Sequence, residues 1–165
     1  MATEKSVTDE QGEQVQFESQ VRKGAALMAL AGIAFVGYGV VFLVLNFVGS
    51  GFELGVSTLA GMTAADLDPT VAYYISHLHV ATAAFIISTG IAVAGLSWYG
   101  VRQGRTWAWA TAIVSAVVGL ALALPMHWTG DAFAHDWVTH LGPIYLATII
   151  FIVGVVLSYR GVQTT

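Results

Sequence analysis

The stretch that decides the fold is residues 25–47, AALMALAGIAFVGYGVVFLVLNF, which contains no Asp, Glu, Lys or Arg. A helix needs about 20 apolar residues to cross the hydrocarbon core of a bilayer. Residues 25–47 are long enough, and Arg22 and Lys23 stand directly before them, where basic side chains can lie at the membrane boundary. This stretch therefore predicts a transmembrane helix.

Three further apolar stretches predict transmembrane helices at about residues 71–99, 107–124 and 143–159. Asp68 and Pro69 are suited to the N-cap and first position of the second helix, and Pro125 is expected to end the third. The predicted fold class is an all-α integral membrane protein, a four-transmembrane-helix bundle. It comprises a polar, acidic cytoplasmic tail at residues 1–21 and a transmembrane domain at residues 22–165. The tail is expected to lack regular structure, with a short surface helix, indicated by the spacing of Val15, Phe17 and Val21, as the alternative.

The composition supports this class and excludes several others. Of the 165 residues, 56% are hydrophobic and 10% are charged, whereas soluble domains carry about 25% charged residues. The net charge of -4 and the lack of any basic run argue against nucleic acid as a partner. The expected partner is the lipid bilayer, with a homo-oligomer or a larger membrane complex left open. Because the chain has no cysteine, a metal would be held by His, carboxylate or Met side chains.

The basic residues predict the orientation. All six lie on one side of the four predicted spans: Lys5, Arg22, Lys23, Arg102, Arg105 and Arg160. By the positive-inside rule, both termini are cytoplasmic and the protein is a multi-pass protein of the plasma (inner) membrane. Aromatic residues are expected to form belts at both boundaries. Tyr73, Tyr74, Trp128 and Trp137 belong to the outer belt, and Trp98, Tyr99, Trp107, Trp109 and Tyr159 belong to the inner one.

Small residues at regular spacing predict where the helices touch. In lipid the hydrophobic effect does not hold helices together, so they associate through close packing, which small residues permit. The expected contact positions are Gly32, Gly37 and Gly39 in the first helix, Ala84, Ser88 and Ala92 in the second, and Thr111, Ser115, Gly119 and Ala123 in the third. Asn46, a single amide in the first helix, is expected to pack without a further role, with capping of the histidine cluster or a hydrogen bond between helices as the alternatives.

The five histidines all fall toward the outer side: His77, His79, His127, His135 and His140. Asp131 and Asp136 each precede a histidine by four residues, a spacing that shares one face of a helix. His77 and His79 lie about 200° apart around a helix, so one can face the bundle while the other faces lipid headgroups or a neighbouring subunit. All five cannot bind one ion.

Four interpretations of this histidine-rich site remain open. The first is a haem held by His77 or His79 together with His135 or His140. The second is a copper or zinc site drawn from His77, His79, His127, Asp131 and Asp136. The third is proton handling or polar-ligand binding, and the fourth is an accessory or structural membrane subunit without a cofactor. The preferred hypothesis is a haem- or metal-binding redox subunit. No activated serine or charged residue within a span indicates catalysis or ion-coupled transport.

Overall fold

The computed structural model describes residues 2–48, 66–127 and 141–163, and these residues are almost entirely helical. They form four long helices: α1 (Ala2–Phe47), α2 (Pro69–Gly95), α3 (Thr106–Ala123) and α4 (Gly142–Gln163). Three short helical segments join or extend them: η3 (Leu96–Gly100), η4 (Val101–Gln103) and η5 (Leu124–His127). In this part of the chain, four helices are long and apolar enough to cross a membrane. The predicted all-helical class and its four apolar helices are confirmed.

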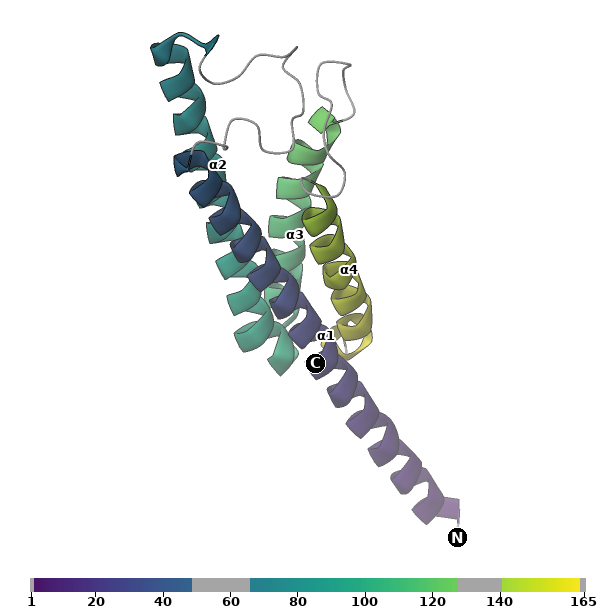
Figure 1. Ribbon diagram of the computed structural model, residues 1–165. Helices are drawn as coiled ribbons and strands as arrows, with labels where there is room; N and C mark the ends of the chain where they lie inside the picture. Colours follow the sequence, from purple (N-terminus) through teal and green to yellow (C-terminus); the bar gives the residue numbers. More distant parts are fainter. Residues whose placement is uncertain (1, 49–65, 128–140, 164–165) are drawn as a thin grey trace.

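Helix α1 is much longer than its apolar stretch. It begins at Ala2, and Figure 1 shows its first half projecting from the end of the bundle where the C-terminus also lies. The expectation that the first residues lack regular structure is therefore wrong for residues 2–21. Glu and Gln, both good helix formers, recur in this segment, and its last turn packs against α4. There, Val21 lies so close to Gly161 that no side chain would fit at Gly161.

Helix α1 packs against α4 with its middle turns, around Gly24 and Met28, and against α2 with its second half (Figure 1). A Cβ placed on Gly24 would lie 2.6 Å from the Gly154 carbonyl oxygen, so the α1 and α4 backbones nearly touch. At the second crossing, a Cβ on Gly32 would lie 2.6 Å from the Ala94 backbone nitrogen. Small residues thus permit both close approaches, as expected for helices that associate in lipid.

The buried stripes of α2 and α3 differ from the predicted ones. In α2 the buried positions are Ala83, Gly90 and Val93, and in α3 they are Ala108, Ala112 and Ala116. Most of the predicted contact positions are instead exposed on the protein surface: Ala84, Ser88 and Ala92 in α2, and Thr111, Gly119 and Ala123 in α3. Gly32 and Gly39 are confirmed as contacts, whereas Gly37 has open space beside it. Small residues spaced four apart form a stripe along a helix. Each of these helices carries several such stripes, and the spacing does not show which of them faces the neighbouring helix.

The short helices η3 and η4 continue α2 as far as Gln103, and a tight turn at Gly104 and Arg105 then leads into α3. Gly104 has a φ of 75°, the left-handed conformation in which glycine commonly ends a helix. Its N–H donates to the Val101 carbonyl over 2.8 Å, and the Arg105 N–H donates to the Gly100 carbonyl over 3.1 Å. Gly100 packs directly against Ala108 of α3. The turn therefore places Arg102 beside the end of the bundle formed by α1 and α4.

Two hydrogen bonds tie α3 to α4 near the same end. The Thr106 hydroxyl donates to the Val162 carbonyl over 2.9 Å, and the Trp109 indole N–H donates to the Ser158 hydroxyl over 3.1 Å. Trp109 is thus a contact between helices, and its ring lies 5.7 Å from that of Tyr159 between centroids. Its assignment to the inner aromatic belt stays a prediction. The indole turns inward because its N–H finds an acceptor on α4. The other described aromatic residues of the two predicted belts are exposed: Tyr73, Tyr74, Trp98, Tyr99, Trp107 and Tyr159.

Candidate functional site

Helix α2 carries two of the five histidines, and its packing gives them different surroundings. His77 is exposed, whereas His79 is half-buried and contacts α1. This arrangement agrees with the separation of about 200° expected for residues two apart on a helix. Asp68 begins this helix as its N-cap, and its carboxylate accepts from the Thr70 N–H over 2.8 Å. The predicted cap and first residue of the second span are therefore confirmed.

The side chains that surround His79 come from matching turns of α1 and α2. The His79 and Phe42 rings meet edge to face, with centroids 5.1 Å apart and an angle of 74° between their planes. One turn away, the Asn46 amide donates to the Ser76 hydroxyl over 2.9 Å. Phe42 and Asn46 are four residues apart and Ser76 and His79 are three apart, so each pair shares one helix face.

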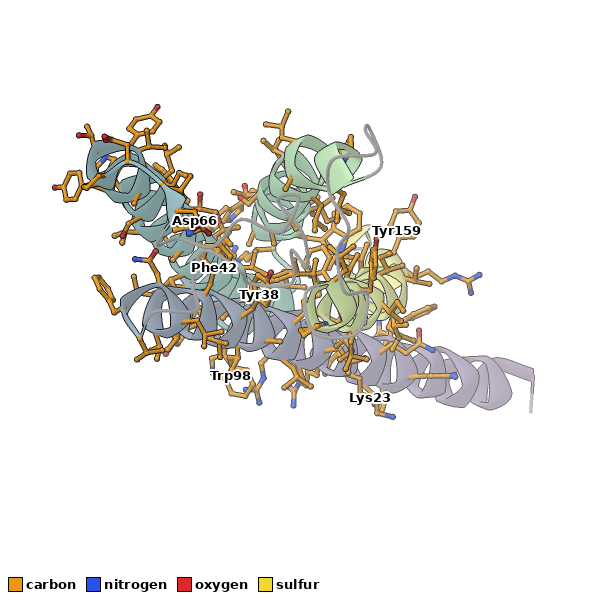
Figure 2. All side chains as sticks on the ribbon, turned by 45° about the horizontal axis from the view of Figure 1, so that its top comes forward. Lys23, Tyr38, Phe42, Asp66, Trp98 and Tyr159 are labelled. Carbon is orange, nitrogen blue, oxygen red and sulfur yellow. The ribbon has the colours of Figure 1, made fainter. Side chains whose placement is uncertain are left out.

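A tight crossing of α1 and α2 closes the space on the other side of His79. A Cβ on Gly39 would lie 2.7 Å from Ile87 Cγ1 and 3.1 Å from the Ala83 carbonyl oxygen. Ala83 is one helical turn from His79. On the α1 side, Tyr38 lies 6.3 Å from Phe42 between ring centroids, and Figure 2 shows both rings on the side of α1 that faces the other helices. The imidazole therefore lies between a close backbone contact and a polar pair.

The Nδ1 atom of His79 is the unusual group in this arrangement. It is buried and has no hydrogen-bond partner among the residues that the structure describes. Each nitrogen of an imidazole is a donor or an acceptor, and leaving a buried one unsatisfied costs free energy. Native proteins rarely leave such a group without a partner, so a ligand, an ion or a further part of the chain is expected to satisfy it.

The remaining predicted site residues are only partly covered by the structure. His127 is the last residue of η5. His135, His140, Asp131 and Asp136 lie outside the described residues, as do Trp128 and Trp137 of the predicted outer belt. Within the described ranges, no group of three or more His, Asp or Glu side chains could hold a metal ion. Two of the predicted ligands, His77 and His79, lie on α2. Of these two, His79 faces another helix and His77 does not.

The sequence indicated a role for the three neighbours of His79 to different degrees. Asn46 stood out as a single amide in an apolar helix. The preferred prediction was packing alone, and its bond to Ser76 instead supports the alternative of a hydrogen bond between helices. Ser76 carried a weaker signal, because a hydroxyl in a membrane helix commonly bonds its own backbone. Phe42 carried no signal, since one aromatic residue among many apolar ones does not indicate which helix it faces.

The four apolar helices are typical of a multi-pass membrane protein. No family model, curated protein or solved structure matches the chain. Its function must therefore be inferred from its own residues.

Proposed function

We propose that this chain is a multi-pass protein of the plasma (inner) membrane, with both termini in the cytoplasm, and that it binds a copper or zinc ion near its outer face. His79 is the proposed ligand from the helix bundle. The observation that carries the proposal is the buried Nδ1 of His79, which has no partner among the described residues. The six basic residues on one side of the spans support the orientation.

Imidazole suits both copper and zinc, and the absence of cysteine leaves histidine as the strongest ligand that this chain offers. One histidine does not make a metal site. The proposed remaining ligands are His127, His135 and His140, with Asp131 or Asp136 as a further ligand or as a hydrogen-bond partner of a histidine. They follow α3 or precede α4 and would reach His79 from the same end of the bundle. Bound copper would supply one-electron redox chemistry, and bound zinc would fix these segments against α2.

The space around His79 favours a metal ion over a haem. The Gly39 contact with Ala83 and Ile87 closes the gap between α1 and α2 on one side of the imidazole. The hydrogen bond between Asn46 and Ser76 closes it on the other. A macrocycle inserted between α1 and α2 at His79 would have to separate both contacts. An ion bound to one ring nitrogen would not, because it needs far less room.

The test compares His79→Ala with its matched control His77→Ala. Both variants remove one imidazole from the same two turns of α2, but only His79 contacts α1. Purified proteins would be loaded with Cu(I), Cu(II) or Zn(II), dialysed and measured by elemental analysis and titration calorimetry. We expect His79→Ala to weaken binding by at least about tenfold, because losing a group that merely hydrogen-bonds a metal ligand already costs about 10–100-fold. His77→Ala should bind as the wild type does.

Three outcomes would reject the proposal. Equal binding by the wild type and His79→Ala would remove His79 from the site. A Soret band in the purified protein would replace the metal ion with a haem. A folded protein that takes up neither copper nor zinc would favour an accessory membrane subunit without a cofactor.

A further inference from the structure

A second polar region lies at the other end of the bundle, where α1, η4 and the end of α4 meet. A cavity of about 610 Å³ lies there, and Arg22, Arg102 and Gln103 line it together with Gly161. A neighbouring cavity of about 360 Å³ is lined by the same three polar residues and by Trp98 and Tyr99. The two cavities thus share two guanidinium groups and one amide that come from different parts of the chain.

The fold determines how these two arginines meet. Arg22 belongs to α1, and Arg102 belongs to η4, just before the left-handed turn at Gly104. Arg102 lies over the Trp98 ring, with 4.4 Å from its central guanidinium carbon to the ring centroid. Such stacking holds a guanidinium in place while leaving its edges free for hydrogen bonds. Helix packing has therefore placed two cations, about 80 positions apart in the sequence, on the same two cavities.

The charge around the larger cavity favours an anion. Glu18 is the acidic residue that lines it, so two guanidinium groups face one carboxylate. The Gln103 amide adds N–H donors to those of the arginines. A guanidinium presents its donors as a planar fork that matches the oxygen atoms of a phosphate. A phosphate group is therefore the chemistry that suits this set of side chains best.

The aromatic neighbours indicate the source of that phosphate. Trp98 and Tyr99 are exposed and lie at the end of an apolar span, the position at which such rings reach the headgroups of a bilayer. Figure 2 shows Trp98 and Lys23 on the same side of α1. Basic pockets between membrane helices at this depth bind anionic lipid headgroups. A soluble phosphate would not need the apolar surface beside it.

We propose that Arg22, Arg102 and Gln103 form a binding site for the phosphate of an anionic phospholipid headgroup, with Trp98 and Tyr99 beside its acyl chains. The site lies about 35 Å along α2 from His79, at 1.5 Å per residue. It does not depend on metal binding at His79.

The test measures lipid retention by native mass spectrometry of the detergent-solubilised protein. Phosphatidylglycerol and phosphatidylcholine would be supplied in equal amounts, and Arg22→Gln and Arg102→Gln would be compared with Lys23→Gln. The control removes the same charge at the same level, but Lys23 lines neither cavity. We expect the wild type to retain phosphatidylglycerol preferentially and each arginine variant to lose about tenfold in retention, the effect of one charge-assisted hydrogen bond. Lys23→Gln should change retention less than twofold.

Several results would overturn the site. Equal losses in all three variants would mean that diffuse charge attracts the lipid. Equal retention of phosphatidylcholine would mean that the headgroup charge is not recognised. Displacement of the lipid by millimolar inorganic phosphate would assign the site to a soluble anion. Arg22→Gln leaves the stack of Arg102 on Trp98 intact, so the comparison holds even where Arg102→Gln does not fold.

Discussion

At the residue scale, the polar side chains of the helices differ in how they satisfy their hydrogen bonds. Some bond the backbone of their own helix, such as the buried Ser97, whose hydroxyl donates to the Val93 carbonyl over 2.6 Å. Others join two helices, as in the pairs Asn46 with Ser76 and Trp109 with Ser158. Because each of these bonds joins particular positions on two helices, these pairs fix helix rotation as well as contact. The buried Nδ1 of His79 differs from both groups, and this is why it marks the candidate site.

Asp68 gives a prediction that concerns pH. The Thr70 N–H, followed by the Thr70 side chain, donates to the Asp68 carboxylate and lowers its pKa below the ordinary 3.8. Because the folded pKa is lowered, the carboxylate stabilises the start of α2 fully above pH 3.8 and loses this effect as the pH falls through the lowered value. The Thr70 amide chemical shift, followed by NMR in micelles, should therefore titrate with a midpoint below 3.8.

Asp68→Asn provides the control for this titration. Asparagine also caps helices well but carries no titrating group, so the Thr70 amide shift should no longer follow the pH in the acid range. A wild-type midpoint at or above 3.8 would show that the capping bond does not stabilise the ionised carboxylate.

At the element scale, α1 is the helix on which the bundle depends. It packs closely against α4 at Gly24 and against α2 at Gly32, and each crossing pairs it with a small residue of the other helix. Helix α3 instead contacts the turn at η3 and reaches α4 through the bonds of Thr106 and Trp109. The helices that are neighbours in sequence are therefore not always the closest neighbours in space. The first and last helices share one of the two most extensive interfaces.

Replacing Gly90 tests the crossing of α1 and α2. A Cβ at this position would lie 2.7 Å from the Gly32 carbonyl oxygen and 2.8 Å from the Val36 backbone nitrogen, so Gly90→Ala must push two backbones apart. We expect a loss of about 1–3 kcal/mol in the free energy of unfolding, the usual cost of overpacking. Reversible unfolding in mixed micelles, followed by circular dichroism, would measure it.

Gly37→Ala is the matched control for this substitution. Gly37 lies in α1 and a Cβ there would meet nothing within 4 Å. Alanine favours helix over glycine by about 1 kcal/mol, so Gly37→Ala should leave stability unchanged or raise it slightly. If Gly37→Ala and Gly90→Ala destabilise the protein equally, the described crossing is not the one that holds α1 and α2 together.

At the scale of the whole molecule, the two ends of the bundle differ in chemistry. His79 lies toward the end at which α2 begins, whereas Arg22 and Arg102 lie at the end where both termini emerge (Figure 1). The proposed metal site and the proposed lipid site therefore lie at opposite ends of the bundle. Any transfer of charge or signal between them would have to follow the length of α1 and α2.

Single cysteines test the orientation, since the natural chain has none and gives no background. Thr70 at the start of α2 is expected to be outside and Gln103 in the turn before α3 to be inside. A cysteine at Thr70 should react with a membrane-impermeant maleimide in intact cells, and one at Gln103 should react only after the cells are opened. The reverse pattern would invert the assignment of both proposed sites.

The sequence by itself determined the features that depend on one helix at a time. The four apolar stretches, the N-cap at Asp68 and the grouping of the basic residues follow from composition and order along the chain. The expected lack of structure before residue 21 was wrong because packing at Gly161 and helix propensity extend α1. The tertiary structure alone decided how each helix is rotated and where the helices cross.

Each helix carries several stripes of small residues that could form an interface, and only the fit of side chains between two helices selects one. For the same reason, packing alone turned His79 rather than His77 toward α1 and brought Arg22 beside Arg102.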